Sequence, residues 1–241
     1  MGMINLRNAM MAGKRLPTAK DYVQDGLVAM WDGIENAGWG VHDQEATTWT
    51  DLMRPDAASK LSVPSGSTWT DDALNLTTEI TTLPPSYFDS ISAARYTFEV
   101  VFTIPEIRQA GGAMLIWRNN MTGPLSISTA WQYLRFTGGG NGEYGSDTQS
   151  FSIKNRIGES FTASMSVLVA ENKLFVDGSL ARSVFPVKYG TSAAHRFYLA
   201  PGGQSSVLYR QIRIYSRALT ADEIAHNYAI DKERFNLPDA S

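Results

Sequence analysis

Paired carboxylates are the first chemistry to test in this chain, because a glycoside hydrolase needs one on each side of the bond that it cleaves. A retaining pair lies about 5–5.5 Å apart and an inverting pair about 6.5–9.5 Å apart. Two acids at positions i and i+2 of a strand share a face at about 6.6 Å. Among the 24 acidic residues, two pairs have this i, i+2 spacing, and neither lies on a predicted strand. They are Asp43 with Glu45 in a loop-like stretch, and Asp231 with Glu233 on a predicted helix. No predicted strand carries a pair.

Glu99 stands alone on its predicted strand, residues 96–104. A lone acid at such a position is usually solvated or paired with a base, and the alternative is direct contact with a ligand. We keep Glu99 as a candidate ligand-binding residue. A second carboxylate from another strand would restore a hydrolase, so a glycoside hydrolase stays as the weaker alternative and no catalytic residue is assigned.

Other hydrolytic sites find no support in the sequence. The three histidines, His42, His195 and His226, lack the spacing of zinc ligands. The Gly-x-Ser-x-Gly elbow of serine hydrolases does not occur. Taken with the missing strand pair, these observations favour a protein that is not an enzyme.

Calcium is the metal that remains open, because the family that the chain resembles, named below, often holds it through loop carboxylates and carbonyl oxygens. No series of acids with the spacing of a calcium-binding loop occurs, so the metal site stays unassigned and no cofactor is certain. The candidate ligands are Asp32, Asp43, Asp51, Asp71 and Asp72.

Aromatic residues give the strongest binding signal. The chain has six tryptophans, ten tyrosines and ten phenylalanines. Flat rings cover the apolar faces of sugar rings, while nearby polar groups hold the hydroxyls. For any one ring, burial in the core is the alternative. The candidate ligand-binding residues at predicted strand ends are Trp117, Arg118, Asn119, Trp131, Tyr133 and Arg135.

The segment "GNGEYG", residues 140–145, fits a dinucleotide-binding glycine pattern by letter. It lies between two predicted strands, so no helix N-terminus is available to hold a phosphate. We interpret it as a loop, in which Tyr144 is a further candidate contact for a ligand.

The elements that must position these residues are short strands. In "YTFEVVFTI" (96–104) alternate residues are apolar, which predicts a half-buried strand. Asp177-Gly178 predicts a tight hairpin turn. Many short strands without intervening helices predict an all-β fold, a two-sheet antiparallel jelly-roll sandwich with a short C-terminal helix. We expect one domain over residues 22–241, preceded by an arm or linker over residues 1–21.

The C-terminal helix has a complete start signal. Thr220 and Glu223 form a capping box, and Leu219 with Ile224 can form a hydrophobic staple. Asp222 adds negative charge to the first turn, where the helix dipole favours it. These residues have structural roles, so we expect a packing helix that covers an edge or an end of the sandwich.

The overall composition excludes several classes of partner. The formal net charge is -3 and basic residues do not gather into a stripe with aromatics, so no nucleic acid is expected. No apolar run is long enough for a membrane span, and the absence of cysteine excludes disulfides. The basic N-terminus lacks the apolar segment of a signal peptide. The arm could be flexible, or it could dock the domain onto a larger assembly.

The segment "YRQIRIYSRALTADEIAHNYAIDKERF" (209–235) resembles the closing strand and helix of laminin G-like domains of the concanavalin A-like lectin/glucanase superfamily. "GLVAMWDGI" (26–34), "TTWTDL" (47–52), "YTFEVVF" (96–102) and "LFVDGSL" (174–180) match its other landmarks in order.

The resemblance implies a curved two-sheet jelly roll that binds glycans or proteins, and it places Trp31 and Trp49 in the core. The chain departs from it at residues 53–56, where Met-Arg-Pro-Asp replaces a Ser-Gly-Asn turn.

Two main functions remain. The first is a non-catalytic recognition module that binds carbohydrate on a cell or particle surface, which implies an extracellular or virion-surface location. The second is a structural module of a larger assembly, such as a phage tail or capsid appendage, with a protein partner bound through the arm.

Overall fold

The computed structural model describes residues 15–56, 59–78, 80–81, 95–106, 115–119, 122–128, 133–136, 149–168, 171–184, 195–199 and 206–239. Residues 81, 115–119, 122–128, 133–136, 149–150, 184 and 195–198 enter this description through their backbone and its pairing alone.

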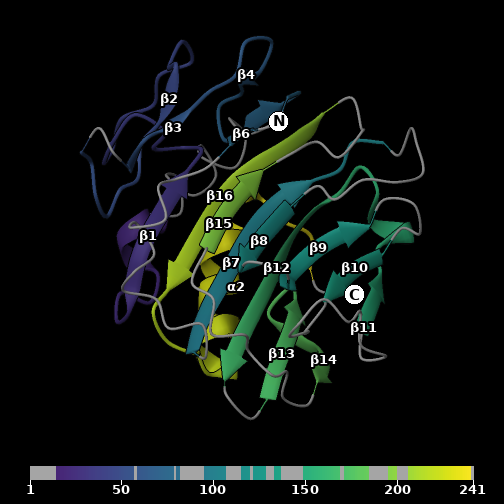
Figure 1. The fold of residues 1–241 in the computed structure, drawn as a ribbon. Coiled ribbons are helices and arrows are strands. Elements are labelled where there is room, and N and C mark those ends of the chain that lie inside the picture. Colours follow the sequence, from purple (N-terminus) through teal and green to yellow (C-terminus); the bar gives the residue numbers. More distant parts are fainter. Residues whose placement is uncertain are drawn as a thin grey trace.

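Two antiparallel sheets pack face to face, as the sequence predicted (Figure 1). The eight-stranded sheet runs in the order β14 (Ser179–Val184), β13 (Glu171–Val176), β12 (Ser160–Leu168), β7 (Arg95–Thr103), β16 (Val207–Tyr215), β5 (Leu74–Leu76) and β4 (Thr68–Trp69), with β1 (Leu27–Asp32) also paired to β16. The six-stranded sheet runs β11 (Gln149–Ser152), β10 (Tyr133–Phe136), β9 (Thr122–Ser128), β8 (Leu115–Asn119), β15 (His195–Leu199) and β6 (Ile80–Thr81).

Smaller elements complete the described fold. Strands β2 (Thr48–Trp49) and β3 (Leu61–Ser62) form a two-stranded sheet. Two short 3₁₀ helices, η1 (Ala19–Asp21) and η5 (Lys154–Arg156), precede the long helix α2 (Ala221–Phe235). Among the described residues, none of the helices combines the length and apolar composition that crossing a bilayer demands.

The core lies between the two large sheets. The alternate residues Tyr96, Phe98, Val100, Phe102 and Ile104 all face it, as the alternation predicted. Leu199 of β15 and Ile80 of β6 reach the same core from the other sheet. The two tryptophans assigned to the core, Trp31 and Trp49, are fully buried.

Strand β16 is the centre of the eight-stranded sheet. It pairs with β7 along one edge, over Leu208 to Tyr215. Along its other edge it pairs with β5 through Val207 to Tyr209 and with β1 through Gln211 to Tyr215. All three partners precede it in the sequence.

Helix α2 begins as predicted. The Thr220 hydroxyl accepts a hydrogen bond from the Glu223 backbone N–H (3.2 Å), and the Glu223 carboxylate accepts one from the Thr220 N–H (2.8 Å). Leu219 and Ile224 are buried in one apolar cluster. The helix ends at Asn236, which adopts the left-handed conformation with φ 51°.

The position of α2 differs from the prediction of an edge or end. The helix lies across the outer face of the eight-stranded sheet, where Asn227 contacts Glu99 of β7 and Asp231 contacts both Arg213 of β16 and Thr162 of β12. Strand β7 is therefore buried on both faces instead of one. The alternation of β7 indicated its core face but could not show that a helix covers the other.

The β13–β14 hairpin turns at Asp177 and Gly178, which have φ values of 49° and 74°. Positive φ at both central residues is the geometry of the predicted primed turn. A Cβ added at Gly178 would lie 2.9 Å from side-chain atoms of Tyr228 on α2. The turn therefore needs glycine both for its backbone and for the approach of the helix.

The described part of the N-terminal arm, residues 15–21, packs against the domain. Ala19 is fully buried, and the Pro17 carbonyl accepts a hydrogen bond from Arg234 of α2 (3.3 Å). The remainder of the arm, residues 1–14, lies outside the described residues.

Candidate functional site

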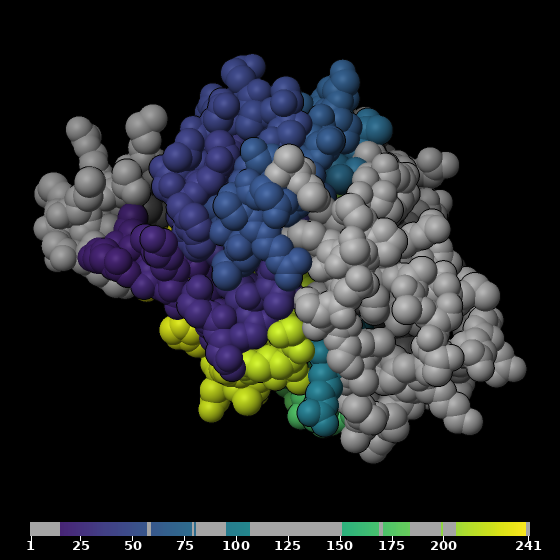
Figure 2. All heavy atoms as spheres, turned by 60° about the vertical axis from the view of Figure 1, so that its left-hand side comes forward, coloured from purple at the N-terminus to yellow at the C-terminus, as the bar shows by residue number. Residues whose placement is uncertain are grey.

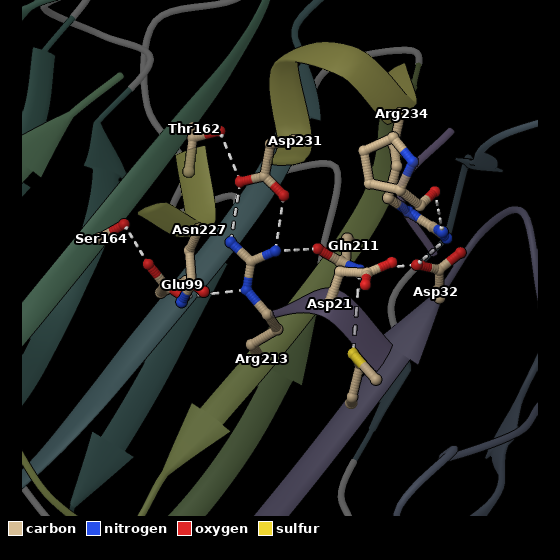
Figure 3. Close-up of polar contacts among 12 residues, drawn as sticks. Asp21, Asp32, Glu99, Thr162, Ser164, Gln211, Arg213, Asn227, Asp231 and Arg234 are labelled. Carbon is tan, nitrogen blue, oxygen red and sulfur yellow. Dashed lines mark hydrogen bonds and ion pairs between the residues drawn. The ribbon is translucent and has the colours of Figure 1, made fainter. Parts of the chain in front are cut away.

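A layer of buried charged residues fills the space between α2 and the sheet beneath it (Figure 3). Arg213 projects from β16, and its Nε donates to a Glu99 oxygen at 2.8 Å. Its two terminal nitrogens donate to the two oxygens of Asp231 at 2.5 and 2.8 Å. All three side chains are at most 1 % exposed. One guanidinium therefore holds a carboxylate from the sheet and a carboxylate from the helix, and we call these three residues the buried triad.

Neighbouring side chains satisfy the remaining oxygens of the buried triad. Asn227 of α2 and Ser164 of β12 donate to Glu99 at 2.7 and 2.9 Å. Thr162 of β12 donates to Asp231 at 3.1 Å. Each carboxylate thus has partners on more than one element, as a buried charge requires.

A second ion pair extends the layer toward β1. Asp32 accepts from Gln211 at 2.6 Å and from Arg234 of α2 at 2.8 Å. The ring of Tyr22 lies 4.1 Å from the Arg213 guanidinium carbon and 5.9 Å from that of Arg234. The network therefore joins β1, β16, β7, β12 and α2 through polar contacts.

The electrostatics of the triad follow from its burial. Burial raises the pKa of the Glu99 carboxyl, and the charge of Asp231 acts in the same direction, while Arg213 works against both. Burial disfavours the charge of Arg213, but Asp231 and Glu99 outweigh it and raise its pKa well above the usual range. The cation therefore stays charged and holds two acids that would otherwise repel each other.

The prediction of Glu99 as a ligand contact is corrected by this geometry. Glu99 is 1 % exposed beneath α2 and is paired with a base, which is the usual role of a lone acid at such a position. Glu99 on β7 and Asp231 on α2 do form a pair of carboxylates from two different elements, and a hydrolase would require such a pair. A guanidinium lies between them and no sugar reaches them, so this pair gives no support for a glycoside hydrolase.

Each of the five acids considered as calcium ligands has other hydrogen-bond partners. Within the described ranges, no group of three or more Asp, Glu or His side chains could hold a metal ion. Asp51 accepts backbone hydrogen bonds from Met30 and Met53, and burial raises its pKa to about 7. The others bond as follows: Asp32 to Arg234, Asp43 to the Glu45 backbone, Asp71 to Gln44, and Asp72 to Arg210.

The pairing of the six-stranded sheet assigns its residues to two faces. Opposed residues share a face and successive residues alternate. Leu199 is buried in the core and is opposed to Leu115. Phe151 packs against the same core and is opposed to Leu134. These pairs identify the core face at both ends of the sheet, and the remaining positions form what we call the six-strand outer face.

Three predicted contact residues fall on the six-strand outer face. Arg118 is opposed to Arg196, and Tyr133 is opposed to Ser152, which is exposed. Arg135 lies two residues from Tyr133 on the same strand. The complete set is Thr81, Ile116, Arg118, Ser126, Ser128, Tyr133, Arg135, Ser150, Ser152, Arg196 and Tyr198.

The other predicted contacts are distributed differently. Trp117 follows Leu115 by two residues and Asn119 follows by four, so both belong to the core face. For Trp117 this favours the core alternative. Trp131 and Tyr144 lie outside the described residues.

Sequence reasoning missed the other two members of the buried triad, because Arg213 and Asp231 come near Glu99 only after β16 and α2 have packed. It also missed Arg196 and Tyr198 on the six-strand outer face. Their signal was present, since they alternate with Phe197 and the buried Leu199 in "HRFYLA".

Comparison with known proteins finds similarity in structure alone. No protein-family model and no curated protein matched the chain, so the laminin G-like assignment stays a prediction. Among solved structures, Trypanosoma rangeli sialidase in complex with sialic acid is similar at a TM-score of 0.60 and 17 % identity, over 90 % of this chain and 34 % of that chain.

The botulinum neurotoxin serotype D binding domain is similar at a TM-score of 0.60 and 9 % identity, over 85 % of this chain and 52 % of that chain. The receptor-binding domain of the C/D mosaic botulinum neurotoxin is similar at 0.60 and 10 % identity, over 86 % and 52 %. The chain thus spans about a third of the sialidase and about half of each toxin domain. At these identities the likeness establishes a shared β-sandwich fold.

Proposed function

We propose that this protein is a non-catalytic recognition module that binds carbohydrate through the six-strand outer face. One observation carries the proposal: the strand register collects Arg118, Tyr133, Arg135, Arg196 and Tyr198 on a single face. Among the described elements, none packs over that face, whereas α2 covers the outer face of the other sheet (Figure 1).

The residue types of this face suit an acidic sugar. Guanidinium groups bind carboxylates through two parallel hydrogen bonds. Tyrosine rings cover apolar faces of pyranoses and keep a hydroxyl for the solvent side. Four serines of the set supply further hydrogen-bonding groups: Ser126, Ser128, Ser150 and Ser152. The sialidase that shares the fold was solved with sialic acid, which supports testing this sugar first.

The remaining predicted contacts keep their place in the proposal. Trp131 precedes β10 in the sequence and Tyr144 follows it, and we propose both as further contacts of the ligand. The finer assignment, a laminin G-like domain that acts at a cell or particle surface, is also part of the proposal.

A glycan array followed by titration with N-acetylneuraminic acid tests the proposal. We expect Arg118→Ala, Tyr133→Ala and Arg135→Ala each to weaken binding about tenfold or more, because each removes about 1.4 kcal/mol or more of contact energy. Arg182→Ala, an exposed arginine on β14 of the other sheet, is the matched control and should leave affinity unchanged. Binding that survives all three substitutions would reject the assignment to this face.

Attachment to a larger assembly is the second candidate function. The packing of residues 15–21 against the domain, with the Pro17 carbonyl bonded to Arg234, favours it because the base of the arm is held in place. Deleting residues 1–14 would then abolish capture of an assembly partner without changing glycan binding, which a pull-down paired with the same titration measures.

A further inference from the structure

A cavity of about 380 Å³ opens at the end of the molecule that β2, β3 and β4 build. Its walls come from residues 44–47, 63–65 and 67–69. In Figure 2 the blue residues of this part of the chain stand at the top of the molecule, and the yellow C-terminal residues lie at the bottom. Small-molecule sites span about 300–1,000 Å³, so the cavity has room for a single sugar ring.

One copy of a duplicated sequence contributes to the cavity lining, and the other copy packs against it. Thr-Trp-Thr-Asp occurs at residues 48–51 and again at 68–71. The two indoles meet edge to face, with ring centroids 5.4 Å apart. Trp49 is fully buried, whereas Trp69 is 8 % exposed and lines the cavity.

Hydrogen bonds within the walls fix their shape. The Trp69 indole N–H donates to the Ala46 carbonyl at 2.8 Å. The Val63 N–H donates to the Thr47 carbonyl at 2.9 Å, which holds the two sides of the cavity together. The cavity is therefore formed before any ligand arrives, which lowers the entropic cost of binding.

The lining combines an apolar base with hydrogen-bonding groups that have no partner. Ala46, Val63, Pro64 and Trp69 supply apolar surface. The side chains that line the cavity but make no hydrogen bond or ion pair within the described part of the chain are Glu45, Thr47, Ser65 and Thr68. A sugar ring presents this same combination, an apolar face with hydroxyls at its edge.

The charge of the lining excludes acidic sugars. Among the described residues that line the cavity, Glu45 is the one ionisable residue, and no Lys, Arg or His accompanies it. A sugar carboxylate placed here would meet a like charge and no cation. We infer that this cavity is a second ligand site, that it binds a neutral sugar ring, and that Glu45 makes it reject acidic sugars. The class of ligand rests on the proposed function, whereas the site is separate from the six-strand outer face.

NMR titration of the ¹⁵N-labelled protein tests the inference, because the Trp69 indole N–H lies at the cavity and reports on it directly. The probes are methyl glycosides of glucose, galactose and mannose, with N-acetylneuraminic acid as the acidic sugar; Trp69→Phe identifies the signal. We expect at least one neutral glycoside to shift this signal to saturation. We expect N-acetylneuraminic acid to need at least about tenfold higher concentration for the same shift. A signal that no neutral glycoside moves, or that the acidic sugar moves equally well, overturns the inference.

Two variants separate the contribution of the space in the cavity from that of the charge of Glu45. Thr68→Trp places a bulky side chain at an exposed wall position and should abolish the shift. Glu45→Gln keeps the size of the side chain and removes its charge. It should leave the affinity for the neutral glycoside within about twofold and raise the affinity for N-acetylneuraminic acid toward that value. Dispersed amide signals confirm that each variant is folded. If Glu45→Gln leaves the acidic sugar as weak as before, Glu45 does not set the selectivity.

The two proposals fail separately. Arg118→Ala with Arg135→Ala should leave the Trp69 shift unchanged while acidic-sugar binding is lost. If acidic-sugar binding follows that pattern and no neutral glycoside reaches the cavity, the proposed function stands and the second site is wrong. If the neutral glycoside binds at Trp69 and the double variant still binds the acidic sugar, the cavity stands and the six-strand outer face is wrong.

Discussion

The outer faces of the two large sheets carry similar polar residues, but α2 covers one of them. On the eight-stranded sheet, Asp231 of the helix closes onto Arg213, and the buried triad is at most 1 % exposed. On the six-stranded sheet, Arg118 and Arg135 belong to a face over which no described helix packs. An arginine under the helix is bound to carboxylates of the fold itself. An arginine on the other sheet is available, in our proposal, to carboxylates of a ligand.

Burial therefore sets the role of these residues more than their type does. A guanidinium in a dry interior must be paired, since an unpaired buried charge costs several kcal/mol. A guanidinium at a solvated surface contributes little to stability. If substitutions on the two faces changed the stability of the protein equally, burial would not set the role of these residues. Changes in stability that grow with burial would support this conclusion.

The largest difference is expected between Arg213→Met and Arg118→Met. Removing Arg213 leaves Glu99 and Asp231 buried without their cation, which should lower the free energy of unfolding by about 3–5 kcal/mol. Arg118→Met should change it by no more than about 0.5 kcal/mol. Urea denaturation of both variants measures the difference, and equal losses would contradict the distinction between the two faces.

A triple variant sharpens this result. Glu99→Leu, Arg213→Met and Asp231→Leu together remove every charge of the buried triad and replace it with apolar volume. We expect this variant to recover most of the stability that Arg213→Met loses, because desolvation offsets much of the attraction in a buried ion pair. A loss as large as that of the single variant would mean that the triad stabilises the fold directly.

The pH dependence of stability gives the next largest effect. Burial raises the pKa of Asp51 from 3.8 to about 7, so the unfolded chain loses this proton first as the pH rises. The free energy of unfolding should therefore fall between about pH 4 and pH 7, by up to about 4 kcal/mol, and then level off. Asp51→Asn should flatten this slope, whereas Asp71→Asn, at an exposed position, should keep it. Urea midpoints at about one-unit pH intervals measure both, and an unchanged slope in Asp51→Asn would show that another group titrates.

The smallest effect concerns the start of the covering helix. Thr220→Ala removes the hydroxyl that caps Glu223 and should cost about 1 kcal/mol. Thr220→Ser keeps a capping hydroxyl and should restore most of that loss. Thermal unfolding of the two variants measures the difference. If both are equally destabilised, the methyl group of Thr220 and not its hydroxyl supports the helix.

Local signals in the sequence predicted the elements well. The alternation of residues 96–104 gave the core face of β7, and the Thr220 and Glu223 pair gave the start of α2. Both depend on neighbours in the chain, where helix and strand periods act directly. Asp177-Gly178 gave its turn for the same reason.

The contacts between distant segments could not be predicted in this way. Glu99 looked like a half-exposed acid because nothing in residues 96–104 indicates that α2 packs over them. The pairing of Arg213 with Asp231 could not be predicted for the same reason. The cavity did leave a trace, since Thr-Trp-Thr-Asp occurs twice, but repetition alone does not say that the two tryptophans meet.

The central position of β16 has a consequence for how the chain is made. Strands β1, β5 and β7 all leave the ribosome before residues 207–215, yet each of them pairs with β16. The eight-stranded sheet therefore stays incomplete until residues 207–215 have been synthesised, because β1, β5 and β7 each lack a neighbouring strand until then. Such long-range pairing slows folding and exposes the nascent chain to aggregation. Translation that stalls before β16 would yield an insoluble fragment and not a smaller working domain.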